Sequence, residues 1–207
     1  MRFLVLGAGG GVGRRAVAAA VQQGDDVVAA ARSAPDARGA RPLAVDVRDG
    51  AALRGAVDGA EAVLWCVGVT RRSGGDVGRA AMPLLVAACA QAGVRRLVSV
   101  SGAGVTLPGD VKGPGARLVS GLTRRLARDL VLDKEGEHAA LVASGLDWTE
   151  VRPPRLVDRS PTGCWQLGEQ APGLTAGPVT KADVALAMLE LARTTRWVRR
   201  APFLTAG

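Results

Sequence analysis

The sequence has few cysteines and no long apolar run. Its cysteines, Cys66, Cys89 and Cys164, are widely separated and never form a C-x-x-C pair, which argues against a disulfide framework and a zinc cluster. No apolar run approaches the roughly 20 residues of a membrane span, and the residues before the first glycine are too few for a signal peptide. We therefore expect a cytoplasmic protein with no metal site and no membrane partner.

Aromatic residues are also scarce. Tyrosine is absent, and two phenylalanines and four tryptophans leave few rings that could stack on bases. The formal net charge of +8 is compatible with nucleic acid, a membrane surface or small anionic ligands. Because the arginines are scattered singly and in pairs rather than gathered in a basic tail, we expect no nucleic-acid partner and favour a small molecule.

Short runs rich in valine and leucine alternate with longer alanine-rich segments, which is the pattern of βαβ units around a parallel sheet. We predict an α/β fold: one Rossmann-type, doubly wound parallel sheet with helices on both faces, as a single domain over residues 1–207, forming a monomer or homodimer. Strands are predicted at 3–6, 27–31, 42–45, 62–67, 96–100 and 147–151. Helices are predicted at 11–23, 51–57, 77–91, 116–143 and 181–193. Residues 102–116 and 153–178 should form a small substrate-side region, with a long loop at 160–178.

Closely spaced glycines stand between the first predicted strand and the first predicted helix. Two registers fit, Gly7-x-Gly9-x-x-Val12 and Gly7-x-x-Gly10-x-x-Gly13, and only the second has glycine at all three points. Glycine lets the backbone approach a pyrophosphate, and the amides of the helix start point at its negative charge. The loop therefore predicts a dinucleotide site formed by Gly7, Gly10, Gly11, Val12 and Gly13.

The residue after the second predicted strand indicates which dinucleotide binds. NAD-specific proteins carry an acidic residue there, whereas this chain has Arg32 followed by Ser33, and its Asp25 and Asp26 lie at the other end of the strand. A guanidinium and a hydroxyl suit a 2′-phosphate, so the predicted cofactor is NADP(H). The alternative interpretation of Arg32 is a solvated loop cation.

Three segments together resemble the atypical short-chain dehydrogenase/reductases. They are the N-terminal glycine loop, Val98-Ser99-Val100-Ser101-Gly102, and the stretch from Ser144-Gly145-Leu146 to Arg152-Pro153-Pro154. Within that group the chain is similar to the NmrA-like, NAD(P)H-binding proteins related to biliverdin reductase B, also called flavin reductase. The resemblance implies that Asp46 and Val47 border the adenine, that Gly68 passes close to the nicotinamide ribose, and that Pro153 flanks the nicotinamide. Asp46 as a turn residue and Gly68 as a strand terminator are the plain alternatives.

Many short-chain dehydrogenases use a Tyr-x-x-x-Lys pair, which the absence of tyrosine excludes here. The resemblance places Ser101 near the nicotinamide, where its hydroxyl could bond a substrate carbonyl or, alternatively, local backbone. Lys134 matches a lysine frequent in NmrA-like proteins and either orients the nicotinamide ribose or is a surface cation. His138, the only imidazole, is a candidate acid or base, although a lone helix histidine is more often structural.

Arg155 marks a departure from the biliverdin reductase B pattern, which has a histidine after the Pro-Pro pair. Arg155, with Arg71 and Arg72, could instead line a site for an anionic acceptor, or be solvated. Hydride transfer to a flavin-like acceptor needs little acid–base help, because the cofactor carries the difficult chemistry.

Three functions follow from these features. The leading hypothesis is an NADP(H)-dependent oxidoreductase that transfers a hydride from NADPH to a small flavin-, quinone- or tetrapyrrole-like acceptor, including anionic ones. The second is a non-catalytic NADP-binding redox sensor of the NmrA-like kind. The third, a nucleotide-sugar epimerase or dehydratase, is weakened because those enzymes rely on the tyrosine that this chain lacks.

Overall fold

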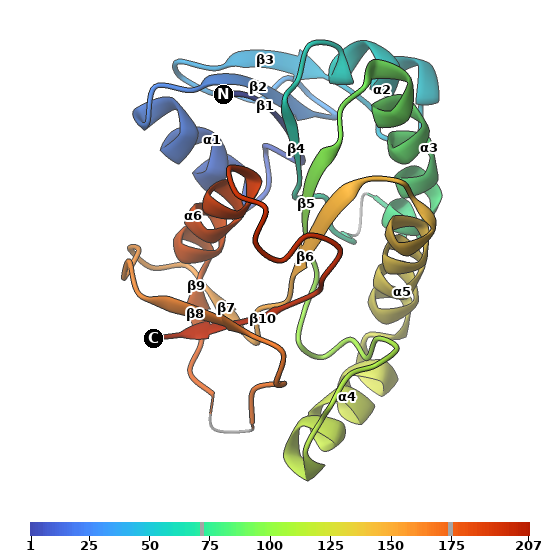
Figure 1. Ribbon diagram of the computed structural model, residues 1–207, viewed down its shortest axis with the longest axis vertical. Coiled ribbons are helices and arrows are strands. Elements are labelled where there is room, and N and C mark those ends of the chain that lie inside the picture. The colour runs from blue at the N-terminus through green and yellow to red at the C-terminus, as the bar shows by residue number, and fades with distance from the viewer. Residues whose placement is uncertain (71–72, 174–175) are drawn as a thin grey trace.

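A six-stranded parallel sheet forms the centre of the protein in a computed structural model that describes residues 1–70, 73–173 and 176–207 (Figure 1). The strand order is β3-β2-β1-β4-β5-β6, which confirms the predicted doubly wound α/β fold. The strands are β1 (Arg2–Leu6), β2 (Asp26–Ala31), β3 (Arg41–Ala44), β4 (Ala62–Trp65), β5 (Arg96–Val100) and β6 (Asp147–Val151).

The direction of winding reverses between β1 and β4. β2 and β3 continue the sheet on one side of β1, whereas β4, β5 and β6 continue it on the other. Leu6, at the end of β1, is paired with Ala30 of β2 and with Trp65 of β4. In open parallel sheets, ligands bind in the crevice outside the carboxyl ends of the strands at such a reversal.

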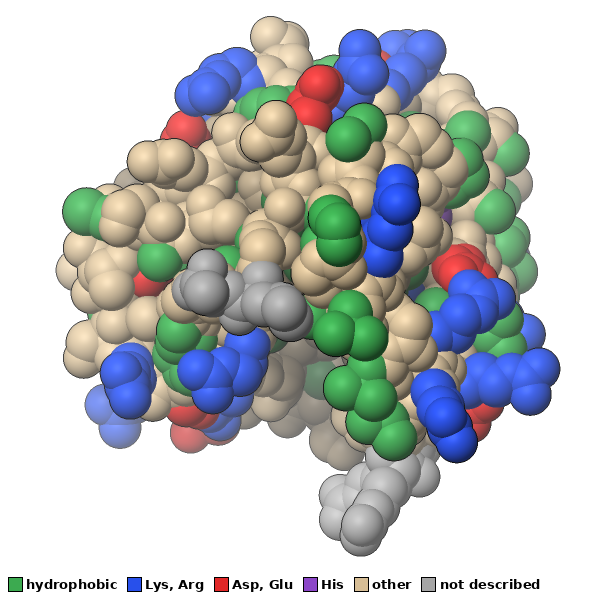
Figure 2. All heavy atoms as spheres, turned by 90° about the horizontal axis from the view of Figure 1, so that it is seen from below, with side chains coloured by type: hydrophobic (Ala, Val, Ile, Leu, Met, Phe, Trp, Pro, Cys, Tyr) green, Lys and Arg blue, Asp and Glu red, His purple; other side chains and the backbone are tan. Residues whose placement is uncertain are grey.

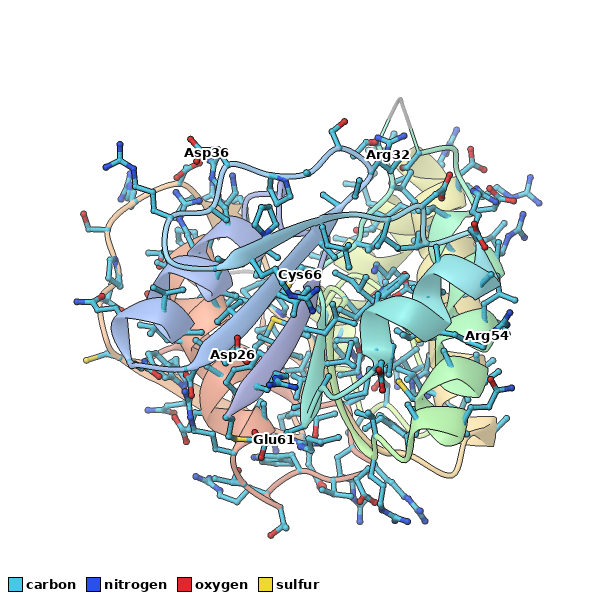
Figure 3. All side chains as sticks on the ribbon, turned by 90° about the horizontal axis from the view of Figure 1, so that it is seen from above. Asp26, Arg32, Asp36, Arg54, Glu61 and Cys66 are labelled. Atoms are coloured by element: carbon cyan, nitrogen blue, oxygen red, sulfur yellow. The ribbon has the colours of Figure 1, made fainter. Side chains whose placement is uncertain are left out.

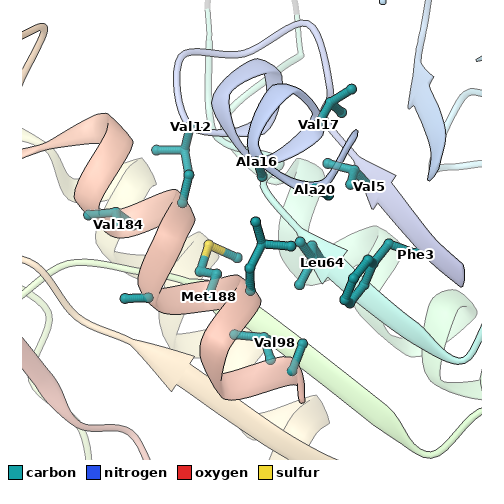
Figure 4. Close-up of a cluster of buried hydrophobic side chains, with 14 of the residues drawn as sticks. Phe3, Val5, Val12, Ala16, Val17, Ala20, Leu64, Val98, Val184 and Met188 are labelled. Atoms are coloured by element: carbon teal, nitrogen blue, oxygen red, sulfur yellow. The ribbon is translucent and has the colours of Figure 1, made fainter. Parts of the chain in front are cut away.

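Helices cover both faces of the sheet (Figure 1). α1 (Gly13–Gln22) and α6 (Lys181–Ala192) pack on one face, and Figure 4 shows their apolar side chains meeting those of β1, β4 and β5. α2 (Gly50–Val57), α3 (Val77–Ala92) and α5 (Arg128–Ala143) pack on the other. β1, β2 and β4 are mostly apolar on both faces because both faces are covered there. No helix among the described residues is long and apolar enough to cross a membrane.

The single helix predicted over 116–143 is wrong, because two helices occupy this stretch. α4 (Pro114–Leu126) ends at Ala127, whose φ of −131° and ψ of 48° break the helix, and α5 follows. Lys112 donates a hydrogen bond to Ser120 of α4 at 2.8 Å, whereas α5 packs along α3. These two anchors hold the helices in different directions. α4 leaves Leu118, Leu122 and Leu126 exposed, and Figure 2 shows a column of hydrophobic side chains on the face seen from below.

The long loop predicted at 160–178 is also only partly correct. β8 (Trp165–Gly168) lies within it and pairs antiparallel with β10 (Phe203–Ala206), near the end of the chain. A second small sheet joins β7 (Leu156–Val157) to β9 (Val179–Thr180) in parallel. The partner strands are far apart in sequence, so no local pattern indicates them.

Candidate cofactor site

A cleft of about 660 Å³ opens at the carboxyl ends of β1, β2, β3 and β4. Figure 3 shows Arg32 and Asp26 at opposite ends of β2. The residues that line the cleft are Gly7, Gly9, Gly10, Ala31, Arg32, Ser33, Val45, Asp46, Val47, Arg48, Cys66, Val67, Gly68, Thr70, Ser73 and Val77. Most of the cofactor-binding residues predicted from the sequence therefore share one cavity.

The glycine loop is shaped by close backbone contacts. Gly7 has a φ of +81°, and a Cβ there would lie 2.7 Å from the carbonyl carbon of Cys66. Gly10 donates its amide hydrogen to the Gly7 carbonyl at 2.9 Å, and a Cβ at Gly13 would collide with that same carbonyl. A side chain is thus excluded at Gly7 and Gly13, the first and last points of the preferred register, and a Cβ at Gly10 would lie only 3.1 Å from the Gly7 carbonyl.

The start of α1 fits an anionic group. No side chain of the described residues caps this helix at Val12, and no acidic residue stands in its first turn. Asp49 caps α2 and Thr180 caps α6, whereas the N-cap residues of α3, α4 and α5 also form no side-chain cap. Exposed amides at a helix start attract phosphate. Val12 itself can contribute only its backbone, because its side chain is buried in the core between α1 and α6 (Figure 4).

The adenosine end of the cleft is basic rather than acidic. Arg32 and Ser33 line it directly after β2. The two acidic residues of that strand region are held at its opposite end, where Asp25 pairs with the amino terminus at 2.9 Å and Asp26 pairs with Arg2 at 2.7 Å. No carboxylate of β2 therefore reaches the position that would hold a free ribose 2′-hydroxyl.

Asp46 serves as a turn residue and also lines the cleft. Its carboxylate accepts a hydrogen bond from the Arg48 amide at 3.0 Å, and its carbonyl accepts one from the Asp49 amide. Asp46 remains exposed, whereas the neighbouring Val47 is buried with its side chain in the core. Asp46 is therefore a turn residue, as the alternative interpretation has it, and it also lies at the border of the cleft.

A buried ion pair between Lys134 and Glu137 contacts Val67, which follows β4 and lines the cleft. The Lys134 ammonium donates hydrogen bonds to both carboxylate oxygens of Glu137, at 2.9 and 2.8 Å, and to the Val67 carbonyl at 3.1 Å. Burial raises the pKa of the Glu137 carboxyl to about 7, although Lys134 acts to lower it. The alternative of a surface cation at Lys134 is wrong, because its side chain is only 6% exposed. Lys134 supports the backbone that passes Gly68.

Ser101 and Pro153 are brought side by side at the ends of β5 and β6. The Ser101 amide donates to the Val151 carbonyl at 2.9 Å, and the Pro153 carbonyl accepts from the Ala103 amide at 2.8 Å. The Ser101 hydroxyl is buried and has no hydrogen-bond partner among the described residues. A buried hydroxyl without a partner is costly unless water or a ligand bonds it.

None of the predicted catalytic residues Ser101, Lys134, His138 and Arg155 is among the residues that line the cleft. The Nδ1 atom of His138 lies 2.7 Å from a carboxylate oxygen of the buried Glu150, and the ring meets Trp148 edge-on at 5.5 Å. Arg155 is exposed, and its carbonyl accepts a hydrogen bond from the Val179 amide. Arg71 and Arg72 lie outside the described residues.

Sequence reasoning missed several residues around this site. Cys66 lines the cleft, and burial raises the pKa of its thiol to about 12, so it stays protonated at neutral pH. Arg48, Thr70 and Ser73 line it as well. They follow β3 or β4 at the carboxyl ends of the strands, and this position in the sequence could have indicated them as cleft residues. Lys181 lies against Gly11, although nothing in the sequence connects the two.

Comparisons with known proteins agree with this geometry. A family model described as NAD(P)H-binding matches residues 7–195. Uncharacterized proteins of Mycobacterium tuberculosis and Mycobacterium bovis are 40% identical over 75 residues, a match that covers 35% of this chain and only 9% of theirs.

Solved structures with the same fold cover nearly the whole chain. The oxidoreductase ylbE from Lactococcus lactis is 20% identical, with a TM-score of 0.81 over 100% of this chain and 91% of its own. ChuY, an anaerobilin reductase from Escherichia coli O157:H7, is 25% identical, with a TM-score of 0.81 over 100% and 97%. A short-chain dehydrogenase/reductase from Veillonella parvula in complex with NADP is 19% identical, with a TM-score of 0.79 over 99% and 94%.

Proposed function

The chain belongs to the NAD(P)H-binding family, and on this premise we propose that it is an NADPH-dependent reductase of the atypical short-chain type, in the NmrA-like group related to biliverdin reductase B. One observation carries the proposal. The cleft at the reversal of the sheet is lined by the glycine loop, which leads into the uncapped start of α1, and by a basic residue, Arg32, after β2. Diphosphate and 2′-phosphate each have a matching partner there.

The residues that would hold NADPH follow from their places around the cleft. The backbone of Gly7, Gly10 and Gly13 would face the diphosphate, and Arg32 with Ser33 would bond the 2′-phosphate. The backbone at Gly68, which Lys134 supports through the Val67 carbonyl, would border the nicotinamide ribose. When bound, the reduced nicotinamide supplies a hydride to an electrophilic acceptor.

The part of the chain that would receive the acceptor is the ends of β5 and β6. The buried Ser101 hydroxyl is the hydrogen-bond donor that we assign to an acceptor carbonyl, since it has no partner among the described residues. The acceptor class that we propose is a flavin, quinone or tetrapyrrole, to which the hydride adds while solvent or Ser101 supplies the proton. The likeness to an anaerobilin reductase at 25% identity supports a tetrapyrrole-type acceptor.

The second candidate is a non-catalytic NADP-binding regulator. Its support is the scarcity of acid–base groups around the cleft: tyrosine is absent, and His138 is engaged with Glu150. Such a sensor would bind NADPH as tightly as a reductase does but would transfer no hydride.

Turnover separates the two functions. Purified protein is mixed with NADPH and, in separate reactions, a flavin, a quinone and a linear tetrapyrrole, and the nicotinamide absorbance is followed while NADPH binding is measured by calorimetry. The reductase predicts oxidation with at least one acceptor and a lower kcat in Ser101→Ala. Binding without oxidation of NADPH on the whole panel would contradict the reductase and favour the regulator.

A further inference from the structure

A lysine at the start of α6 lies against the glycine loop. Lys181 is the first residue of α6, and its aliphatic chain lies over Gly11, where a Cβ would come within 2.8 Å of the lysine Cδ. The Lys181 ammonium lies 3.1 Å from the same Cβ position. The lysine thus fills the space that a side chain at position 11 would occupy.

Asp158 gathers three cations at this place. Its carboxylate contacts Lys181 at 3.2 Å and Arg14 at 3.6 Å, and it bonds the Arg15 guanidinium. Arg15 also donates a hydrogen bond to the Gly11 carbonyl at 2.7 Å. The hydrogen bond from Lys181, followed by the charges of the two arginines, holds the pKa of Asp158 below its usual range, so the carboxylate is ionised at neutral pH.

The charges of this cluster do not balance. Three cations face one carboxylate, which leaves a formal excess of two positive charges beside the glycine loop. The helix start next to it adds further positive potential, because α1 has neither a side-chain cap nor an acid in its first turn. A group with two negative charges would neutralise the excess.

We propose that Lys181 and Arg15 bind the diphosphate of the dinucleotide, and that Asp158 is an internal anion that holds these two cations in place and competes with the diphosphate for them. The inference rests on the proposed binding of NADPH and adds the residues that neutralise its diphosphate. Arg14 is more exposed, at 59% of its side chain, and more distant from Asp158, so its contribution is the smallest of the three.

Ligand fragments test the assignment without any turnover. Dissociation constants are measured by calorimetry for NADPH, for inorganic pyrophosphate and for 2′-AMP, which carries the adenosine 2′-phosphate but no diphosphate. Lys181→Met should weaken NADPH and pyrophosphate about tenfold, the effect of one lost charge-assisted hydrogen bond, and leave 2′-AMP unchanged. Lys181→Arg should restore most of the affinity, and thermal unfolding checks that each variant is folded.

Asp158→Asn should have the opposite effect. Removing the competing carboxylate should tighten NADPH and pyrophosphate by about threefold, within the range of an exposed ion pair, and steepen the dependence of affinity on salt. The matched control is Asp26→Asn, which removes an exposed ion pair with Arg2 at the opposite end of β2 and should change nothing.

Three results would overturn the inference: unchanged NADPH affinity in Lys181→Met, equal weakening of 2′-AMP, or weaker binding in Asp158→Asn. A wild-type protein that binds pyrophosphate but not NADPH would instead contradict the proposed function and leave the cation site standing.

Discussion

The guanidinium of Arg152, at the end of β6, donates two hydrogen bonds to the carboxylate of Asp110 in the loop after β5, at 2.7 and 2.5 Å. The same guanidinium lies over the Phe203 ring at 4.0 Å and donates to the Val105 carbonyl at 3.0 Å. Both charged side chains are almost completely buried. This pair fastens the loop that carries Ser101 to the strand that leads into Pro153.

Arg152→Met should lower the free energy of unfolding by about 3 kcal/mol, because the buried Asp110 carboxylate loses both guanidinium hydrogen bonds. Among the described residues it keeps only the Leu107 amide at 2.9 Å and the Lys112 ammonium at 3.6 Å. Urea unfolding measures the change. The control is Arg95→Met on the same sheet, whose pair with Asp147 is exposed and should cost less than about 1 kcal/mol. Equal losses in the two variants would contradict a special role for the buried pair.

Glu137 should make stability depend on pH. Burial raises its pKa from 4.5 to about 7, so the folded protein holds a proton that the unfolded chain releases. The resulting stabilisation is complete below about pH 4.5 and is lost as the pH rises to about 7, a change of roughly 3 kcal/mol. In Glu137→Gln this component should vanish from unfolding free energies measured across that range, whereas Glu135→Gln, on the same helix, should retain it. An unaltered pH profile in Glu137→Gln would refute the prediction.

Gly13→Ala should disrupt the glycine loop, since the added methyl group would meet the Gly7 carbonyl and the backbone of Ala8, which cannot move away as a flexible side chain can. We expect a loss of at least about 2 kcal/mol in stability, in the range of overpacked sites. Gly9→Ala is the control, because its Cβ would meet only the Ala31 Cβ, at 3.9 Å. Thermal unfolding of the two variants is compared, and similar melting temperatures would count against this steric account.

Asp183 ties the start of α6 to the segment before β8. Its carboxylate accepts hydrogen bonds from the Thr162 and Gly163 amides, at 2.9 and 3.0 Å, and from the Thr180 hydroxyl at 2.8 Å. Asp183→Ala should therefore cost about 3 kcal/mol and expose the Thr162 and Gly163 amides to hydrogen exchange. The exposed cap Asp49→Ala should cost only about 1 kcal/mol. Unchanged protection of the two amides would contradict the role of Asp183.

Much of the fold follows from local patterns in the sequence. Each central strand is a short apolar run, and each is found within two residues of its expected bounds. The glycine loop, Arg32, Asp46 and Gly68 meet in one cleft, because the carboxyl ends of neighbouring parallel strands share one edge. These relationships need only the strand order and the direction of winding.

The remainder depends on contacts between distant segments. The break at Ala127 interrupts a stretch of good helix formers, so only the separate packing of α4 and α5 reveals it. Lys181 reaches Gly11 because α6 follows β9, whose pairing with β7 is not visible in the sequence. The burial of Lys134 likewise depends on α5 packing along α3 and on the hydrogen bond from Lys134 to the Val67 carbonyl after β4. A helical pattern alone cannot distinguish this position from a surface position.

The central claim is that the cleft binds NADPH in preference to NADH through Arg32. The most direct measurement is a calorimetric titration of both dinucleotides into wild-type protein and into Arg32→Ala. A charge-assisted contact with the 2′-phosphate predicts at least about tenfold tighter binding of NADPH by the wild type, with the preference lost in the variant and the affinity for NADH retained. Equal wild-type affinities for NADPH and NADH would contradict the claim.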